Sequence, residues 1–581
     1  MSVEEIIESF HRNGVLGEFS GIPYPEADAR TRAAVRAMQE LLAQSRARAA
    51  AENHLVEIPA HAVSGTNGGD TYRVHPDGRV ERVLERFPEV ERRFGSIPCA
   101  AGERDAPIEE ARPVFLRCAY NGLWSPSGTN WQPVRCLELG AEDSARAGLS
   151  PAPGGGLLVL CRDRYDSILG DVARLCGICQ DSHAEDIDLG IWHLCAEQTA
   201  RFHHATLASR RILASERDRV TQAALASIEE RRPRLSEGSQ AAARALADSL
   251  RASRHVPVFF LTLRLARPLA LDPRQPGGIA ASDFDRLIEA RSTQRVCSAA
   301  PLEEAELLDL WRRSLPCLGA GARSALDFPV FSREHPLVAA VGQAMHRAIE
   351  GDGTRPGLVG AACAQSLKRY LASYPELPED VRAFATQAEC AQDVPLPARL
   401  IPPHLAARLC DGGQFREEGG FLLDHRGRKL SSERLMKLVR MIARSFGKYF
   451  LSFKNTHPLL GILRYLDPGE PARCRELFFE AGRAVAAMTY LARARGLVSI
   501  IKSGPVELSR DDLQALAAAH APRPDATSSP CPLLTFQLGL PLSPDERVCA
   551  GQPDEHDGLA ERMLDRRAPR ARLSEHYLPR V

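Results

Sequence analysis

The sequence predicts an α+β protein built from two similar units, each with an antiparallel or mixed sheet core flanked by helices. Two apolar runs, 256–265 and 533–542, are typical of buried strands, and a proline (Pro268 or Pro541) stops each one. A long amphipathic helical pattern precedes each run in its own half of the chain. The recurrence indicates a degenerate internal duplication, and a chance recurrence of strands is the alternative.

Composition excludes several classes of partner. The 581 residues suffice for three or four domains. Lys+Arg and Asp+Glu number 74 each, so no net field attracts nucleic acid or an anionic membrane. No apolar run approaches the roughly 20 residues that span a bilayer, and the acidic start 1–5 has no signal-like segment. We therefore expect a cytoplasmic protein that binds neither nucleic acid nor membrane.

The cysteines predict no metal site. The 15 cysteines lie mostly among apolar neighbours, and in a reducing compartment we expect them to be mainly small buried hydrophobic residues. Cys176 and Cys179 form one C-x-x-C pair, and His183 is the one further ligand type nearby. A redox role for this pair is the alternative to a structural one.

Residues 1–85 are predicted to form an N-terminal arm with no chemistry-bearing motif. The Ala/Arg-rich stretch 31–51 predicts an amphipathic helix. Residues 64–70 predict a flexible turn, and 72–80 predict a hairpin around Pro-Asp-Gly. Such an arm could dock a partner or cover a site.

The first unit covers 86–275. Periodicity predicts its helices and strands, which are helices at 114–120, at 186–213 and within 214–254, and strands at 134–139, 157–161 and 256–265.

The second unit covers 281–545 and carries an insertion at about 345–470. Its predicted elements are helices at 283–290, 302–315 and 474–495, an extended crossing at 497–501 and a strand at 533–542. Gly496 stops the last helix. The insertion contains a basic helix at 432–450, whose cationic face is either solvated or covers an anionic ligand. A polar tail, 546–581, follows.

The chain is organised around the segment 125–133, Ser-Pro-Ser-Gly-Thr-Asn-Trp-Gln-Pro, which lies between a predicted helix and a predicted strand. Its prolines keep the backbone open and its N–H groups available. Asn130 and Gln132 can each donate and accept, so they suit a heterocycle that carries both C=O and N–H. An ordinary Pro/Ser/Gly loop is the alternative.

This segment resembles the flavin-contacting loop of the nitroreductase-like family of FMN flavoproteins, which has the form Pro-Ser-x-x-Asn-x-Gln-Pro. The matching residues are Pro126, Ser127, Asn130, Gln132 and Pro133, with Thr129 among them. Val134 departs from the pattern, since family members usually have Trp there. The resemblance implies that Pro126, Ser127, Thr129, Asn130 and Gln132 contact FMN.

A second segment, Arg291-Ser292-x-x-Arg295, presents two guanidinium groups and a hydroxyl that suit a phosphate monoester. Surface ion pairs would explain these arginines as well. The resemblance adds that an Arg-Ser-x-x-Arg segment near the start of the family domain binds the FMN phosphate. It also implies a phosphate role for a basic, proline-containing cluster after the last strand, which here includes Arg567 and Arg570.

Placement of these segments suggests a fused dimer. Family members are intertwined dimers with flavin at the interface, and here the loop lies in the first unit while Arg291 begins the second. The resemblance therefore implies an intramolecular pseudo-dimer with one composite site, because 316–324 in the second unit has no Asn and no Gln-Pro. Within the crossing 497–507, Ser503 and Gly504 are candidates to present backbone N–H groups to the central ring nitrogen.

The resemblance implies an FMN-dependent oxidoreductase that moves hydride from NADPH or NADH to a small organic acceptor in two steps. The alternatives are an oxygen-using FMN dehydrogenase or flavin-cleaving enzyme of a biosynthetic pathway, and a non-catalytic binding subunit. The sequence names no catalytic acid or base, and His193, His203 and His204 are expected to pack or face solvent. We expect a monomeric pseudo-dimer or a homo-oligomer of it, with a small-molecule substrate.

Overall fold

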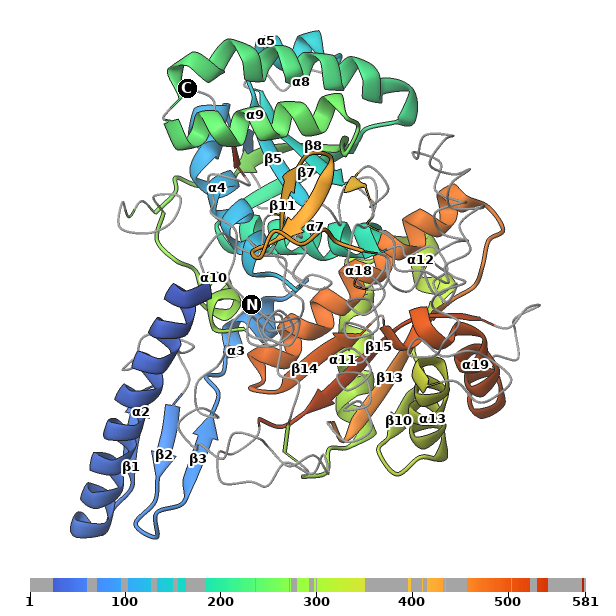
Figure 1. Ribbon diagram of the computed structural model, residues 1–581. Helices are drawn as coiled ribbons and strands as arrows, with labels where there is room; N and C mark the ends of the chain where they lie inside the picture. Colours follow the sequence, from blue (N-terminus) through green and yellow to red (C-terminus); the bar gives the residue numbers. More distant parts are fainter. Residues whose placement is uncertain are drawn as a thin grey trace.

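The computed structural model describes most of the chain (Figure 1). The described residues are 24–59, 71–95, 103–126, 133–149, 155–162, 184–235, 237–270, 272, 279–291, 297–298, 300–350, 395, 397–398, 410, 415–431, 434, 457–502, 504–522, 530–541 and 577–578. None of the helices in these ranges combines the length and apolar character that a bilayer crossing requires. Over the same ranges, no three His, Cys, Asp or Glu side chains gather as a metal ion requires.

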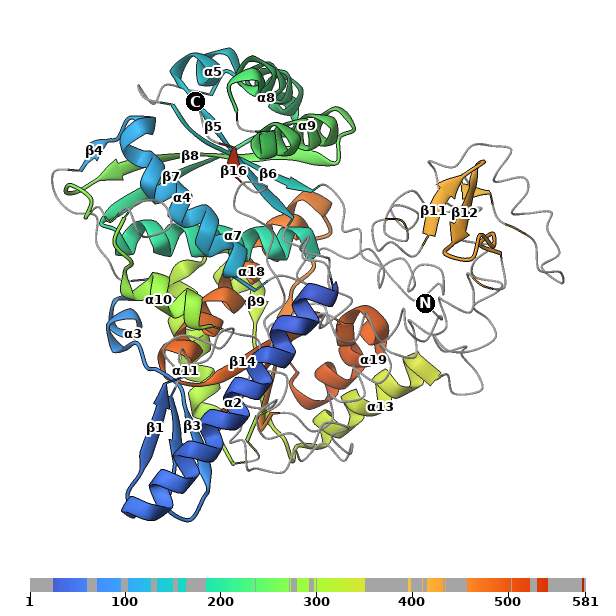
Figure 2. The same cartoon turned by 60° about the vertical axis from the view of Figure 1, so that its left-hand side comes forward.

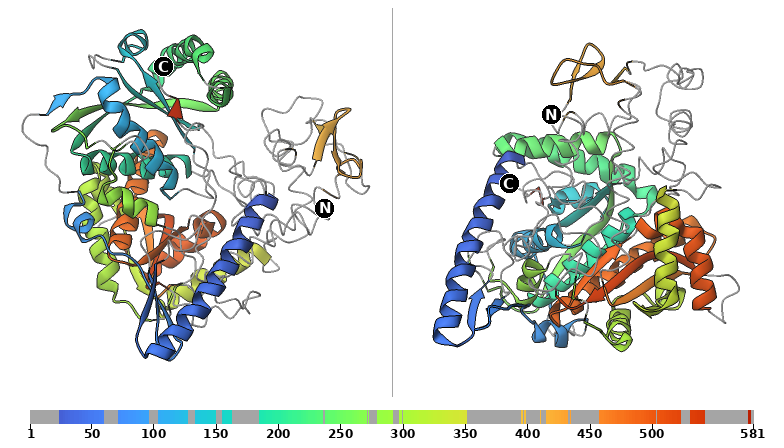
Figure 3. Two further views of the ribbon diagram at one scale, coloured as in Figure 1. Left: turned by 90° about the vertical axis from the view of Figure 1, so that its left-hand side faces the viewer. Right: turned by 60° about the horizontal axis from the view of Figure 1, so that its bottom comes forward.

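The N-terminal arm is a small two-layer module that extends away from the rest of the chain (Figures 1 and 3). Helix α2 (Tyr24–Glu52) packs on an antiparallel meander of β1 (Val56–Pro59), β2 (Thr71–Val74) and β3 (Val80–Val83). The predicted helix and the predicted Pro-Asp-Gly hairpin are confirmed, and β1 was not predicted. The arm has its own small core, formed by Leu42, Ala49, Val56, Ile58, Tyr72, Val74 and Val80.

The first unit is a sheet covered by helices on both faces (Figure 2). Its strands are β4 (Arg104–Asp105), β5 (Val134–Leu139), β6 (Gly156–Arg162), β7 (Ala205–Arg211) and β8 (His255–Leu265). Its helices are α4 (Ile108–Trp124), α5 (Ala141–Arg146), α7 (Ala184–Phe202), α8 (Arg217–Arg231) and α9 (Glu237–Arg251). Alternate side chains of the strands share one core with α4 and α7 and a second core with α8 and α9.

The second unit has a similar sheet with helices on its faces. Its strands are β9 (Leu326–Asp327), β10 (Val330–Ser332), β13 (Leu459–Tyr465), β14 (Val498–Lys502) and β15 (Cys531–Gly539). Its helices are α10 (Asp283–Ala290), α11 (Glu304–Ser314), α12 (Ala320–Ala325), α13 (Pro336–Glu350), α18 (Pro471–Ala494) and α19 (Gly504–His520). A separate hairpin of β11 (Phe415–Glu418) and β12 (Phe421–Asp424) lies apart from both units (Figures 2 and 3).

The two sheets share one topology. In the first the strand order is β5-β6-β8-β7, in the second it is β10-β13-β15-β14, and every one of these pairs is antiparallel. The connections also correspond. In the first unit β6 leads to α7, then to the edge strand β7, and then through α8 and α9 to β8. In the second unit β13 leads to α18, then to the edge strand β14, and then through α19 to β15. Even the register irregularities correspond, at Val159/Leu160 in β6 and at Leu463/Arg464 in β13.

The two units meet where α7 crosses α18 (Figures 1 and 2). Gly190 of α7 lies against the backbone of Phe479, and Gly482 of α18 lies against the backbone of Ile187. Each glycine therefore contacts the residue three positions before the other, as a local two-fold relation between the helices requires. The absence of a side chain at both positions lets the backbones come this close.

Three sequence predictions differ from the structure. The crossing predicted over 497–507 is extended only as far as Lys502, because α19 begins at Gly504. The helix predicted over 186–213 was wrong at its end: it stops at Phe202, His204 adopts a left-handed φ of 57°, and β7 follows. The partner strand β8, about 50 residues later, supplies the hydrogen bonds that make 205–211 a strand. The strand β13 falls inside the predicted insertion 345–470, yet it is central in the second sheet.

Other predictions have mixed outcomes. The remaining predicted helices and strands of both units are present, including the stop at Gly496, which has a φ of 76°. Of the nine described cysteines, six are buried. The turn 64–70 and the pair Cys176 and Cys179 lie outside the described residues, as does the helix 432–450 except for Arg434.

Candidate functional site

The start of the segment 125–133 is fixed at the C-terminal end of α4. A Cβ atom at Gly122 would overlap the indole of Trp192 in α7, so this glycine lets the two helices pack closely. Ser125 ends α4 in an extended conformation, and its buried hydroxyl donates to the carbonyl of Gly122 at 2.6 Å. Pro126 follows and is partly exposed. The chain thus leaves α4 in a defined direction.

Arg291 connects the second predicted segment to the first. It is the C-cap residue of α10, and only 4% of it is exposed. Its Nη2 donates to the carbonyl of Trp124, the last residue of α4, at 2.8 Å across 167 residues of sequence. The first arginine of the predicted phosphate fork therefore lies at the beginning of the predicted flavin loop.

The other predicted site residues are described only in part. Gly504 is the first residue of α19, directly after the edge strand β14 and residue 503. The predicted site residues that lie outside the described part of the chain are Ser127, Thr129, Asn130, Gln132, Ser292, Arg295, Ser503, Arg567 and Arg570. Their roles stay predictions.

The end of α10 that carries Arg291 is packed onto α18. Arg493 of α18 donates to the carbonyl of Ala290 at 3.3 Å, which places a cation at the negative end of α10. Tyr490 of α18 and Cys195 of α7 are buried beside Arg291. Burial raises the pKa of the Tyr490 phenol well above its ordinary value, although the nearby Arg291 charge opposes this. The surroundings of Arg291 on α18 and α7 are therefore polar and shielded from water.

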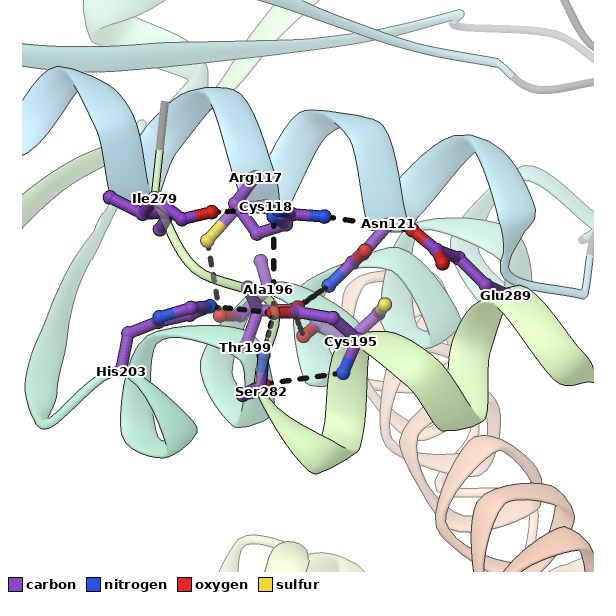
Figure 4. Close-up of polar contacts among 11 residues, drawn as sticks. Arg117, Cys118, Asn121, Cys195, Ala196, Thr199, His203, Ile279, Ser282 and Glu289 are labelled. Carbon is purple, nitrogen blue, oxygen red and sulfur yellow. Dashed lines mark hydrogen bonds and ion pairs between the residues drawn. The ribbon is translucent and has the colours of Figure 1, made fainter. Parts of the chain in front are cut away.

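The other end of α10 is held by a group of buried polar side chains, the Asp285 cluster (Figure 4). Its members are Arg117, Asn121, Thr199, His203, Ser282 and Asp285. The cluster joins α10 of the second unit to α4 and α7 of the first. The cluster was not predicted from the sequence, although Ser282-x-x-Asp285 is a recognisable helix-start pattern.

Between the units, Arg483 of α18 forms a second buried network with α7. Its Nη1 donates to Nδ1 of His193 at 2.7 Å, and its Nη2 lies 2.9 Å from a carboxylate oxygen of Glu197. Nε2 of His193 is 3.0 Å from the Ser209 hydroxyl. Burial, and then the Arg483 charge, lower the pKa of His193 to about 4. His193 therefore packs as a neutral ring, as the sequence analysis expected.

The C-terminal strand β16 (Tyr577–Leu578) returns to the first unit, which the sequence did not predict. It pairs in parallel with β5, with Tyr577 opposite Cys136. The Tyr577 hydroxyl donates to the buried carboxylate of Glu138, which also accepts from Arg112 at 2.9 Å. Because the pairing is parallel, the chain enters β16 from the side on which β5, and hence the segment 125–133, joins the sheet.

The corresponding position in the second unit is built differently. After α11 the chain forms a turn of 3₁₀ helix (Leu315–Cys317) and then α12, where the first unit has the segment 125–133. Gly95, which follows α3 (Pro88–Arg93), lies beside the Cys317 sulfur, and Arg483 donates to the Cys317 carbonyl. The described contacts at this position are thus those of Cys317 with Gly95 and with Arg483.

Comparisons with known proteins find similarity among solved structures. No family model and no curated protein matches the chain. The FMN-dependent nitroreductase NfnB from Mycobacterium smegmatis, in complex with NADPH, is 14% identical over 50% of this chain and 95% of its own, with a TM-score of 0.26. A BluB-like flavoprotein from Clostridium difficile is 12% identical over 48% of this chain and 95% of its own, with a TM-score of 0.24.

A putative nitroreductase from Anabaena variabilis covers more of this chain, 76%, and 90% of its own, with 9% identity and a TM-score of 0.33. The similar structures are thus two nitroreductases, one of them putative, and a BluB-like flavoprotein.

Proposed function

We propose that this protein is an FMN-dependent oxidoreductase of the nitroreductase type, with one flavin site between its two units. The observation that carries the proposal is the hydrogen bond from Arg291 to the Trp124 carbonyl. It joins two segments that the sequence analysis assigned, separately, to the phosphate and to the ring of one cofactor.

The residue types proposed for the site suit FMN in their chemistry. Arg291 as a residue is only 4% exposed, so its guanidinium lies in low-dielectric surroundings, where a phosphate would form a strong charge-assisted pair with it. Arg291, Ser292 and Arg295 would hold the phosphate, with Arg567 and Arg570 approaching from the tail. Asn130 and Gln132 would orient the ring, and the backbone at Ser503 and Gly504 would face its centre.

When bound, FMN supplies the hydride chemistry that links a reduced nicotinamide to an organic acceptor. The chain's own part is to bind, orient and keep the site dry. We identify no protein acid or base for the reaction. Both ring nitrogens of the buried His193 are hydrogen-bonded, one to Arg483 and the other to Ser209. NADPH or NADH is the proposed reductant, and a small organic molecule the proposed acceptor.

We also propose that the chain is a covalent pseudo-dimer that arose by duplication. Three observations support this: the shared strand order of the two sheets, the reciprocal glycine crossing of α7 and α18, and the exchange of elements between units. In that exchange, α10 of the second unit packs on α4 and α7, while α3 of the first packs on α18. β16 likewise joins the first sheet.

Flavin binding tests the function. We expect purified protein reconstituted with FMN to be yellow, to be bleached by NADPH or NADH without oxygen, and to release about one FMN per chain on denaturation. Asn130→Leu should lower that ratio toward zero. A ratio near two, or half of the flavin persisting in Asn130→Leu, would show that the second position also binds. A protein that stays colourless with FMN overturns the proposal.

Arg291→Ala tests the phosphate assignment. A charge-assisted hydrogen bond is worth about 1.5–3 kcal/mol, so the variant should bind FMN roughly tenfold to a hundredfold more weakly and riboflavin nearly unchanged. Arg464→Ala is the matched control, because that arginine is also buried but pairs with Asp327 inside the second sheet. Equal FMN affinity in Arg291→Ala and the parent protein would remove Arg291 from the site.

A further inference from the structure

The short helix α10 is fixed to the first unit at both ends. It has 8 residues and begins the second unit, yet it packs on α4 and α7. At its C-terminal end Arg291 reaches the Trp124 carbonyl of α4. At its N-terminal end, Oδ1 of Asp285 accepts a hydrogen bond from Nδ2 of Asn121, which also lies in α4, at 2.6 Å. We propose that Asp285, held by Asn121, is the positioning residue that places Arg291 at the flavin site; this rests on the proposed function.

The described hydrogen-bond partners of the Asp285 carboxylate lie in α4, at the end of α7 and at the N-cap of α10 itself. One oxygen, Oδ1, accepts from Nδ2 of Asn121 in α4. The other, Oδ2, accepts from Nε2 of His203, at the end of α7, at 2.8 Å, and from the backbone N–H of Ser282 at 2.7 Å. The side chain of Asp285 is 0% exposed. The bond to Ser282 caps α10 itself, whereas the bonds from α4 and from the end of α7 leave α10 little freedom to turn about its axis.

The carboxylate remains charged in this buried position. Burial by itself raises the pKa of Asp285, but the hydrogen bond from His203 and the charges of His203 and Arg117 outweigh it, so the pKa lies below its ordinary value. Arg117 of α4 is itself 0% exposed, with its Nε 3.8 Å from Asp285 and its Nη2 donating to the Ile279 carbonyl. A buried ion is retained at such a position when its hydrogen bonds are satisfied, and it then fixes one arrangement.

Apolar packing alone would not set the position of Arg291. Phe284, Leu287 and Ile288 bury the inner side of α10, and such contacts determine how deep the helix lies. They permit a small rotation or slide, since apolar contact has no preferred direction. A helix of two turns is also too short to hold its own shape. The directional contacts of Asp285 act about 9 Å along the axis from Arg291, at 1.5 Å per residue.

The test compares the affinity for FMN with the affinity for riboflavin in one set of variants. Asn121→Ala and Asp285→Asn should each bind FMN about fivefold to tenfold more weakly than the parent protein, with riboflavin within twofold. Leu250→Ala, in the distant α9 core, is the control for lost stability and should leave the FMN-to-riboflavin ratio unchanged.

A double variant separates positioning from general loosening. If Asn121 acts through Arg291, then Asn121→Ala should cause no further loss of FMN affinity in an Arg291→Ala background. An unchanged ratio in both Asn121→Ala and Asp285→Asn, with Arg291→Ala still selective for FMN, overturns the positioning role alone. An equal loss in Leu250→Ala also overturns it. An Arg291→Ala variant with an unchanged ratio instead overturns the phosphate assignment on which the inference rests.

Discussion

Substitution of the glycines where α7 crosses α18 should lower the stability of the protein. A Cβ atom at Gly190 would lie 2.9 Å from the carbonyl carbon of Phe479 and closer still to its oxygen, whereas ordinary contacts begin at 3.4 Å. The obstructing atoms are backbone, so no rotamer change relieves the overlap. Gly190→Ala must therefore move the two helices apart by more than about 0.5 Å, because the carbon alone requires that shift and the oxygen lies closer.

Overpacking of this kind costs about 1–3 kcal/mol, and more where the backbone must move. The better helix propensity of alanine offsets up to about 1 kcal/mol. Because the obstructing atoms are backbone, the overpacking cost lies at or above the upper end of that range, so we expect Gly190→Ala, and equally Gly482→Ala, to lower the free energy of unfolding by about 2–3 kcal/mol. The double variant should lose less than the sum, because one separation of the helices accommodates both methyl groups.

The assay is guanidinium unfolding followed by circular dichroism. Gly321→Ala is the matched control: it also lies in a helix, α12, but a Cβ atom there meets nothing within 4 Å. We expect it to be as stable as the parent protein or slightly more so. Midpoints for Gly190→Ala and Gly482→Ala equal to that of Gly321→Ala would refute the crossing described above.

Two further predictions concern buried polar groups. The unfolded chain protonates His193 near pH 6.5, whereas the folded chain keeps it neutral to about pH 4. Stability due to this residue is therefore present above pH 6.5 and falls by up to roughly 3 kcal/mol between pH 6.5 and 4. His193→Gln should lack this loss, and parallel pH–stability curves for parent and variant would contradict it. Tyr577→Phe removes a hydrogen bond to the buried Glu138 carboxylate and should cost about 1–3 kcal/mol, measured by denaturant midpoint; an unchanged midpoint would show that β16 contributes little.

The candidate site was only partly predictable from the sequence. The types of its residues could be predicted. An amide-rich loop between prolines has the donors and acceptors that a flavin ring needs, and an Arg-Ser-x-x-Arg segment has the donors that its phosphate needs. The Asp285 cluster could not be predicted, since Asn121 is one polar residue in an apolar helix and its partner lies 164 residues away. The helix at 283–290 was predicted from its periodicity, but such a pattern could not indicate that Asp285 also reaches α4 and α7.

The sequence by itself determined the elements with strong local patterns. Apolar periodicity predicted α4, β5, β6, β8, α10 and α18, and Gly496 predicted the end of α18. Such signals depend on neighbours within one or two turns. Only the tertiary structure decided that 205–211 is a strand, that β16 joins the first sheet, and that Arg291 meets Trp124. Each of these depends on hydrogen-bond partners far away in the chain, which no local pattern specifies.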